Sequence, residues 1–260
     1  MSPITPSSSS WEVPRHVALI ADGNGRWAQA RGALPLAGHE AGAATLGARI
    51  RDAIDFGIHQ LTVYSFSTEN WSRPAQEVHG LLSMFADRLT VETRRLRREG
   101  VQIRFIGQLA GLPDRLVQSM RWSHEQTRSN TTLTLFIALN YGARAEILTA
   151  ARAFTGGGEA AFRRLLYDPD MHDPDIVIRT GGEHRLSNYL LWQAAEAELV
   201  FRDELWPDFT RTSFRESLET RASRNPSARI PLLAPEPVQV QEFSSPAERA
   251  TARSRNAAVA

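Results

Sequence analysis

The sequence predicts an α/β fold, a single domain with a six-stranded, mostly parallel sheet flanked by helices. Three observations support this prediction. Six short apolar runs rich in β-branched residues are separated mostly by segments of helical length. The longer segments carry apolar residues at helical spacing. The chain has 260 residues, 42% of them hydrophobic, which is enough for one large domain with a substantial core.

The six predicted strands are nearly continuous apolar runs, which is typical of strands that are buried on both faces of a sheet. They comprise residues 16–22, 61–67, 101–107, 133–140, 176–179 and 199–202. Helices are predicted over residues 39–56, 75–99 and 113–126, and a further one beginning near Ser187. Gly57 and Gly100 provide helix stops, and Pro113 suits a first helical turn.

The two ends of the chain differ in composition from residues 14–230, which are expected to form the domain. Residues 1–13 lack the apolar core of a secretory signal, and we interpret them as a disordered leader. Residues 231–260, rich in Pro, Ala, Ser and Arg, are interpreted as a disordered tail. No apolar run approaches the roughly 20 residues that span a bilayer. A cytoplasmic location is therefore expected.

Composition excludes several kinds of chemistry. The chain has no cysteine, which rules out disulfides, zinc–thiolate sites and a cysteine nucleophile. It also has no lysine, so a Schiff base and a Walker-type phosphate site are excluded. Its basic side chains are arginines, whose planar guanidinium groups suit phosphate. The formal net charge of +1 argues against nucleic acid as a partner.

Polar clusters follow four of the predicted strands. They are residues 22–26, 67–70, 140–144 and 179–183. Ligands of open parallel sheets bind outside the carboxyl ends of the strands, so these clusters outline one candidate site. Elsewhere, Arg94, Arg95, Arg97 and Arg98 are expected to form a solvated helix end.

The first cluster runs from Asp22 to Trp27. Its carboxylate can hold a hard cation, and its glycines let backbone N–H groups approach phosphate oxygens. Arg26 can add a charge-assisted hydrogen bond. The alternative is a plain strand-to-helix turn that uses Asp, Gly and Asn for their backbone preferences. The spacing does not match the dinucleotide-binding pattern G-x-G-x-x-G.

Two further clusters, which we extend and call the second (residues 67–74) and the third (residues 179–188), also combine charge with hydroxyl groups. A capped helix start explains part of the second cluster, but not Asn70, Trp71 and Arg73. The third offers two arginines, a glycine pair and a hydroxyl group, which suit a diphosphate. Its alternative is a glycine turn followed by a helix cap. Glu198 is either a second cation ligand or a surface charge.

In this order the clusters resemble the motifs of the cis-prenyltransferases, the undecaprenyl diphosphate synthase family. The resemblance covers roughly residues 14–220. The matching stretches are residues 16–27, Gly38-His39 with Ala41-Gly42, residues 64–74, 140–144, 175–188, 191–193 and 206–209. One departure is Pro35, at a position where many members carry an arginine.

The resemblance implies that the chain condenses isopentenyl diphosphate onto an allylic diphosphate, usually farnesyl diphosphate, giving a Z-polyprenyl diphosphate such as undecaprenyl diphosphate. It also implies Mg²⁺ as cofactor, a hydrophobic tunnel for the product and a homodimer. The implied catalytic residues are Asp22 and Asn70, and the metal ligands Asp22 and Glu198, the latter presented through the dimer. The implied substrate-binding residues are Gly23, Asn24, Gly25, Arg26, Trp27, His39, Ser67, Thr68, Glu69, Trp71, Arg73, Arg179, Arg185 and Ser187.

The sequence leaves three alternative hypotheses open. In the first the chain is a short-chain Z-prenyl diphosphate synthase, in the second it is a non-catalytic partner subunit of a cis-prenyltransferase, and in the third it is a phosphatase with Asp22 as nucleophile. Small Ser65 and the lack of an insertion in residues 75–99 favour a medium-to-long product. Peripheral membrane contact is expected for the release of such a lipid, and Trp71 with its loop is expected to keep water from the reacting carbons.

Overall fold

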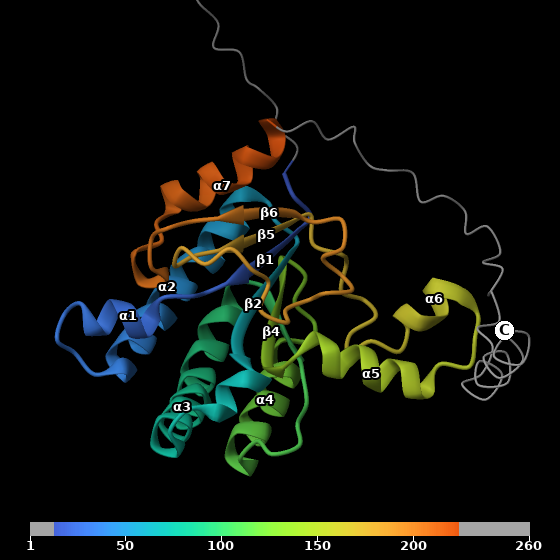
Figure 1. The fold of residues 1–260 in the computed structure, drawn as a ribbon, viewed down its shortest axis with the longest axis horizontal. Coiled ribbons are helices and arrows are strands. Elements are labelled where there is room, and N and C mark those ends of the chain that lie inside the picture. Colours follow the sequence, from blue (N-terminus) through green and yellow to red (C-terminus); the bar gives the residue numbers. More distant parts are fainter. Residues whose placement is uncertain (1–12, 224–260) are drawn as a thin grey trace, which may run out of the picture. The chain divides into compact units, whose positions relative to one another are not determined.

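All six strands of the sheet run parallel, in the order β3-β4-β2-β1-β5-β6, in the computed structural model, which describes residues 13–223 (Figure 1). The strands are β1 (His16–Ile20), β2 (Gln60–Ser67), β3 (Val101–Ile106), β4 (Leu133–Tyr141), β5 (Ile176–Arg179) and β6 (Glu198–Phe201). This sheet confirms the predicted fold class. Because β1 lies centrally between β2 and β5, the chain after β1 emerges in the middle of the carboxyl edge.

The helices lie between the strands, as expected for parallel connections. They are α1 (Asn24–Gln29), α2 (Pro35–Phe56), the 3₁₀ turn η1 (Thr68–Ser72), α3 (Ala75–Arg98), α4 (Asp114–Thr127), α5 (Ala143–Ala153), α6 (Gly158–Arg163), the 3₁₀ turn η2 (Trp206–Asp208) and α7 (Arg211–Ser223). Helix α2 begins four residues before its predicted start, because Pro35 occupies its first turn. Gly57 ends it with φ 80°, as predicted.

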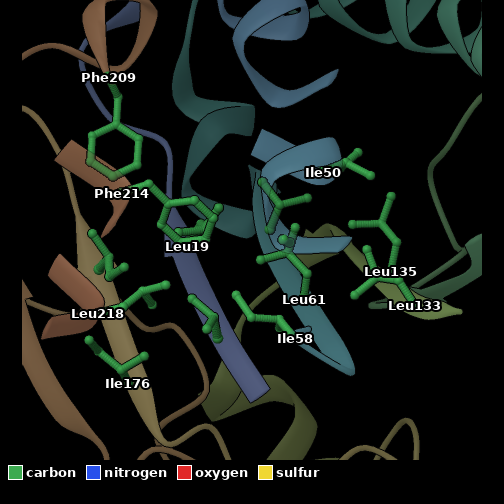
Figure 2. Packing of buried hydrophobic residues seen from close by; sticks show 14 of the residues in the cluster. Leu19, Ile50, Ile58, Leu61, Leu133, Leu135, Ile176, Phe209, Phe214 and Leu218 are labelled. Atoms are coloured by element: carbon green, nitrogen blue, oxygen red, sulfur yellow. The ribbon is translucent and has the colours of Figure 1, made fainter. Parts of the chain in front are cut away.

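One face of the sheet packs against α2 and α7. Figure 2 shows Phe214 and Leu218 of α7 beside Leu19 of β1 and Ile176 of β5, with Ile50 of α2 farther along the same face. All five side chains are at most 2% exposed. The alternating residues of each strand supply this core, as a pleated strand requires.

The other face is covered by α5 and by irregular chain after β5. Phe136 and Tyr141 of β4 pack there with Tyr189 and Leu190, all of them buried. Helices α3 and α4 pack together beside β2, β3 and β4 and enclose a further apolar cluster. The sheet is thus covered on both faces, with its carboxyl edge left for polar loops.

The predicted helix near Ser187 is absent, and that prediction was wrong. Residues 187–196 form turns, and Ser187, Asn188 and Leu190 have φ values of 51°, 61° and 45°. Such left-handed conformations cannot continue a right-handed helix. Tertiary hydrogen bonds hold this backbone, since Asn188 accepts from the amide of Arg144 and donates to Glu69.

The predicted leader and tail fall, apart from Val13, outside the described residues. Within residues 13–223, no helix has the length and hydropathy that crossing a membrane requires.

Candidate active site

Asp22 occupies the centre of the carboxyl edge, directly after β1. Its Oδ2 lies 2.9 Å from Nη2 of Arg179 at the end of β5, and its Oδ1 lies 3.2 Å from Nη2 of Arg26 in α1. The Arg179 side chain is 5% exposed whereas that of Asp22 is 29% exposed. The carboxylate is therefore held by cations on two sides and still faces open space.

Two glycines make this arrangement possible. Gly23 has φ 116°, and a Cβ there would lie 2.9 Å from Cδ2 of Leu205. Gly181 has φ 87°, and a Cβ there would lie 2.5 Å from Nη2 of Arg26. The guanidinium of Arg26 uses that space to donate a 2.7 Å hydrogen bond to the Gly181 carbonyl oxygen. Any larger residue at either position would displace the groups around Asp22.

The β5 side of the site is organised by Arg179. Its Nη1 donates to Oγ of Ser187 at 2.6 Å, which fixes the hydroxyl group beside the guanidinium. Its buried Nε–H has no protein partner. Arg185 lies next to this group and pairs with Glu183. A buried guanidinium with a spare donor is a suitable partner for an anionic oxygen.

The turn η1 forms the neighbouring wall. Oδ1 of Asn70 accepts from the amide of Ser67 at 3.0 Å, which closes the turn on itself. Glu69 accepts a 2.7 Å hydrogen bond from Nδ2 of Asn188. Burial acts to raise the pKa of Glu69, but hydrogen bonds, the largest from Asn188, outweigh it and lower the pKa. Glu69 therefore ties η1 to the segment that carries Ser187.

His39 lies on the other side of Asp22, in the second turn of α2. Burial, with a smaller contribution from the positive charge of Arg73, lowers the pKa of His39 to about 4. Its imidazole is neutral near pH 7 and can donate one hydrogen bond. The same helix holds Asn24 closely, because a Cβ on Gly38 would lie 2.0 Å from the backbone oxygen of Asn24.

Two hollows meet at Asp22. The smaller has a volume of about 530 Å³ and lies against α1 and the start of α2, where Gly23, Gly25 and Arg26 line it. The larger has a volume of about 700 Å³, begins at Arg179 and Ser187, and extends between α2, α3 and the sheet. Its inner walls are mainly apolar and include Leu46, Ile50, Val63, Leu81, Met84, Phe85, Leu89, Ile103, Phe105, Leu135 and Ile137. Asp22, Asn24, His39 and Arg73 line both hollows.

Most of the predicted site residues come together here. Those lining the larger hollow are Asp22, Asn24, His39, Ser67, Glu69, Asn70, Arg73, Arg179, Arg185 and Ser187. Gly23, Gly25 and Arg26 line the smaller one. Their roles toward substrates remain predictions.

Three of the predicted substrate-binding side chains line neither hollow. Trp27 donates to Oδ1 of Asp208 at 2.8 Å and carries Arg31 over its ring, so it joins α1 to η2. Thr68 donates to Glu69. Trp71 donates to Oδ1 of Asn140 at 2.7 Å and packs edge-on against Phe66. This geometry makes Trp71 an anchor of η1 in the described state.

Glu198 lies at the amino edge of the sheet, opposite the carboxyl edge that holds Asp22. It is the first residue of β6 and lies at the level of Ile176 in β5 and Val17 in β1. That level is five residues before Asp22, or about 16 Å along the strand. Within one chain the two carboxylates are therefore too far apart to share an ion.

Some residues of the site were missed by sequence reasoning. Thr180 donates to the backbone oxygen of Asp22 at 2.8 Å and so fixes the turn after β1. Asn188 joins η1 to the start of α5, and its preference for left-handed backbone was the available signal.

The predicted solvated arginines are exposed at positions 94, 97 and 98, but Arg95 lines the larger hollow instead, which corrects that prediction.

Comparisons with known proteins agree with this geometry. The family described as "Putative undecaprenyl diphosphate synthase" matches residues 20–227. The chain belongs to the undecaprenyl diphosphate synthase family. The predicted membership of the cis-prenyltransferases is thereby confirmed, and the chain is a prenyl-transferring enzyme. The phosphatase alternative is dropped.

Relatives within this family cover most of the chain. An isoprenyl transferase of Thermotoga maritima is 44% identical over 82% of this chain and 95% of its own length. The ditrans,polycis-undecaprenyl-diphosphate synthase ((2E,6E)-farnesyl-diphosphate specific) of Salmonella typhimurium is 45% identical over 81% of this chain and 88% of its own length. Lavandulyl diphosphate synthase from Lavandula x intermedia, solved with dimethylallyl diphosphate, has a TM-score of 0.79 and 30% identity, covering 82% of this chain and 97% of the other.

Proposed function

We propose that this enzyme elongates an allylic diphosphate, with farnesyl diphosphate as the expected starter, by cis addition of isopentenyl diphosphate units. The observation that carries the proposal is the position of Asp22 between two hollows, with Arg26 on one side and Arg179 on the other. Two diphosphates need two groups of cations, and an apolar chain needs the apolar space that leads away from them.

The allylic diphosphate is assigned to the smaller hollow. There Gly23 and Gly25 leave the backbone accessible, and Arg26 supplies charge. His39 is neutral and donates a hydrogen bond without adding a second positive charge. When the diphosphate leaves the allylic carbon its oxygens gain negative charge, which these preorganised donors stabilise.

Isopentenyl diphosphate is assigned to the Arg179 side. Arg179, Arg185 and Ser187 line this part of the larger hollow, and the unpartnered Nε–H of Arg179 is available for a phosphate oxygen. The homoallylic double bond then lies toward Asp22 and Asn70. Holding both substrates on one rigid sheet edge removes much of the entropic cost of their encounter.

Mg²⁺ fits this donor set. Within residues 13–223 no group of three or more His, Asp or Glu side chains can hold a metal by itself. Mg²⁺ in phosphoryl sites is commonly bound by one or two carboxylates together with substrate phosphates, and Asp22 offers a partly exposed carboxylate between both diphosphate positions. Bound there, Mg²⁺ would neutralise phosphate charge. Glu198 is the proposed second carboxylate, supplied by another copy of the chain.

Bond formation at the terminal methylene carbon of isopentenyl diphosphate leaves positive charge on C3, which is removed by the loss of a proton from C2. The amide of Asn70 is a very weak base, and its oxygen already accepts from Ser67. We therefore assign Asn70 to positioning and the proton to a diphosphate oxygen or to Asp22. The growing chain is accommodated in the apolar part of the larger hollow, which also keeps water away from the allylic carbon.

Radiolabelled isopentenyl diphosphate, Mg²⁺ and a panel of allylic diphosphates test the proposal, with the products sized after removal of the phosphates. We expect the purified protein alone to give a ladder of Z-polyprenyl products from farnesyl diphosphate. Release of phosphate without new carbon–carbon bonds would refute it. Activity only after addition of a homologous subunit would establish the partner-subunit alternative instead.

A further inference from the structure

The wall that α3 contributes to the larger hollow is apolar at the start of the helix and partly charged toward its end. Near the carboxyl edge of the sheet it presents Leu81, Met84 and Phe85. From the next turn onward it presents Arg88, Glu92 and Arg95 together with Leu89 and Leu96. The opposite wall stays apolar at this depth, with residues from α2 and the sheet. Charged side chains thus enter an otherwise apolar space from one side only.

The guanidinium of Arg95 is held rigidly at this point. Its Nε and Nη2 donate to Oε2 of Glu92 at 2.9 and 2.6 Å, and its Nη1 donates to both carboxylate oxygens of Glu99 at 2.9 Å. The partners stand one turn before and one turn after Arg95 on the same helix. Such two-sided, charge-assisted pairing fixes the planar group in one orientation.

Helix α2 leaves room for this group at Gly47. A Cβ on Gly47 would lie only 3.2 Å from Nη2 of Arg95, which is already a close contact. The tip of Arg95 therefore reaches α2 and occupies the space between the two helices. Any residue larger than glycine at position 47 would compete for that space.

The position of Arg95 along α3 places it at the inner end of the hollow. The helix begins beside η1 at the carboxyl edge and ends just before β3, at the amino edge. From Leu81 to Arg95 it rises about 21 Å. Arg95 is 24% exposed and Glu92 34% exposed, so both side chains remain in contact with water.

We propose that Arg95, braced by Glu92 and Glu99 against Gly47, closes the inner end of the hollow and thereby limits the length of the polyprenyl product. This inference rests on the proposed function. A hydrocarbon end that reaches the ion-paired guanidinium can advance only by breaking its hydrogen bonds and burying unpaired charge, which is unfavourable. Elongation then stops and the product dissociates.

The test compares product ladders of the wild type, Arg95→Ala and the matched control Arg94→Ala, all made from farnesyl diphosphate, isopentenyl diphosphate and Mg²⁺. Arg94 is exposed on the same helix and does not line the hollow. We expect Arg95→Ala to shift the main product upward by at least one five-carbon unit, and Arg94→Ala to leave it unchanged. Identical product ladders for all three proteins would refute the proposal that Arg95 limits the length of the product.

Two further variants keep the test decisive. If Arg95→Ala lacks a cooperative thermal transition, Arg95→Met replaces it. The flexible, uncharged side chain pairs with neither glutamate, so a longer product is again expected. Adding Gly47→Leu to Arg95→Ala refills the gap from α2 and is expected to return the product to the wild-type length or below. Long products from that double variant would contradict a steric closure. A wild type without polyprenyl product would instead refute the proposed function.

Discussion

Asp22 lies between the two proposed diphosphate positions. Its two oxygens face Arg179 and Arg26, and it lines both hollows. No other acidic side chain of the described chain combines these contacts. A change confined to this carboxylate therefore tests the proposed chemistry at the smallest scale.

We expect Asp22→Asn to lower kcat by about 10²- to 10³-fold, the usual cost of removing one preorganised electrostatic group. The amide keeps the size of the side chain and still accepts from Arg179, so the far-UV spectrum and Tm should stay close to those of the wild type. The assay is incorporation of labelled isopentenyl diphosphate. Asp87→Asn is the matched control, since Asp87 of α3 forms an exposed ion pair with Arg115 of α4 and lines neither hollow, so the change should leave kcat unchanged. Equal turnover by Asp22→Asn and the wild type would refute the role of Asp22.

At the scale of elements, the close contact between α1 and α2 sets the smaller hollow. Gly38 and Gly42 of α2 face Asn24, and a Cβ on either would come within 2.2 Å of its oxygen atoms. Helix α1 therefore has its position only because α2 lacks side chains at these two places. The backbone that approaches the allylic diphosphate depends on this contact.

Gly38→Ala should force α1 away from α2. We expect a loss of about 1–3 kcal/mol in the free energy of unfolding, measured with urea, together with a raised KM for the allylic substrate. Gly80→Ala is the control, because a Cβ at Gly80 meets nothing within 4 Å and alanine favours the helix. It should be neutral or stabilising. If both variants behaved alike, the contact between α1 and α2 would not control the site.

Elements with local signals were predictable from sequence, and those held by distant contacts were not. Helices α2 and α3 follow from their apolar spacing and from Gly57 and Gly100. The turns after Ser187 depend on the hydrogen bond from Asn188 to Glu69, which lies 119 residues away in the chain. No local pattern encodes such a pairing.

The site shows the same division. Residues in motifs at strand ends were predicted, because parallel strands bring their carboxyl ends to one edge. Arg95 was wrongly predicted to be solvated, since the residue that leaves space for it, Gly47, belongs to another helix. Trp27 and Trp71 stand in the right motifs, but their partners Asp208 and Asn140 direct them away from both hollows.

At the scale of the whole molecule, acid stability depends on the buried His16. Burial lowers the pKa of this residue to about 4, and its ring contacts Thr62 Oγ1 at 2.7 Å and the His172 carbonyl oxygen at 2.6 Å. The unfolded chain takes up a proton near pH 6.5, but the folded chain does so only near pH 4. The contribution of the neutral His16 to the free energy of unfolding is therefore fully present above pH 6.5 and is lost as the pH drops toward 4.

We expect the contribution of His16 to this loss to be about 3 kcal/mol between pH 7 and pH 4. Chemical unfolding of the wild type and of His16→Gln at several pH values measures it. The glutamine does not titrate, so the variant should be less stable at pH 7 yet lose less stability on acidification. The same slope in both proteins would show that folding does not lower the pKa of His16.

The distance between Glu198 and Asp22 within one chain leads to a prediction about sites shared between two copies of the chain. If Glu198 serves the site of a second copy, Asp22→Asn and Glu198→Gln should each be nearly inactive alone. Subunits exchanged at equal amounts would form mixed dimers with one intact site, which restores about a quarter of wild-type activity. No recovery after exchange, verified by the mass of the mixed dimer, would place the two carboxylates in independent roles.

The most direct test of the account is a crystal structure of the protein with Mg²⁺, isopentenyl diphosphate and the unreactive farnesyl thiodiphosphate. We predict one diphosphate beside Gly25, Arg26 and His39, and the other on Arg179, Arg185 and Ser187. The carboxylate of Asp22 should lie between them, and the farnesyl chain should enter the hollow between α2 and α3. Diphosphates bound away from Asp22, or a farnesyl chain outside that hollow, would contradict it.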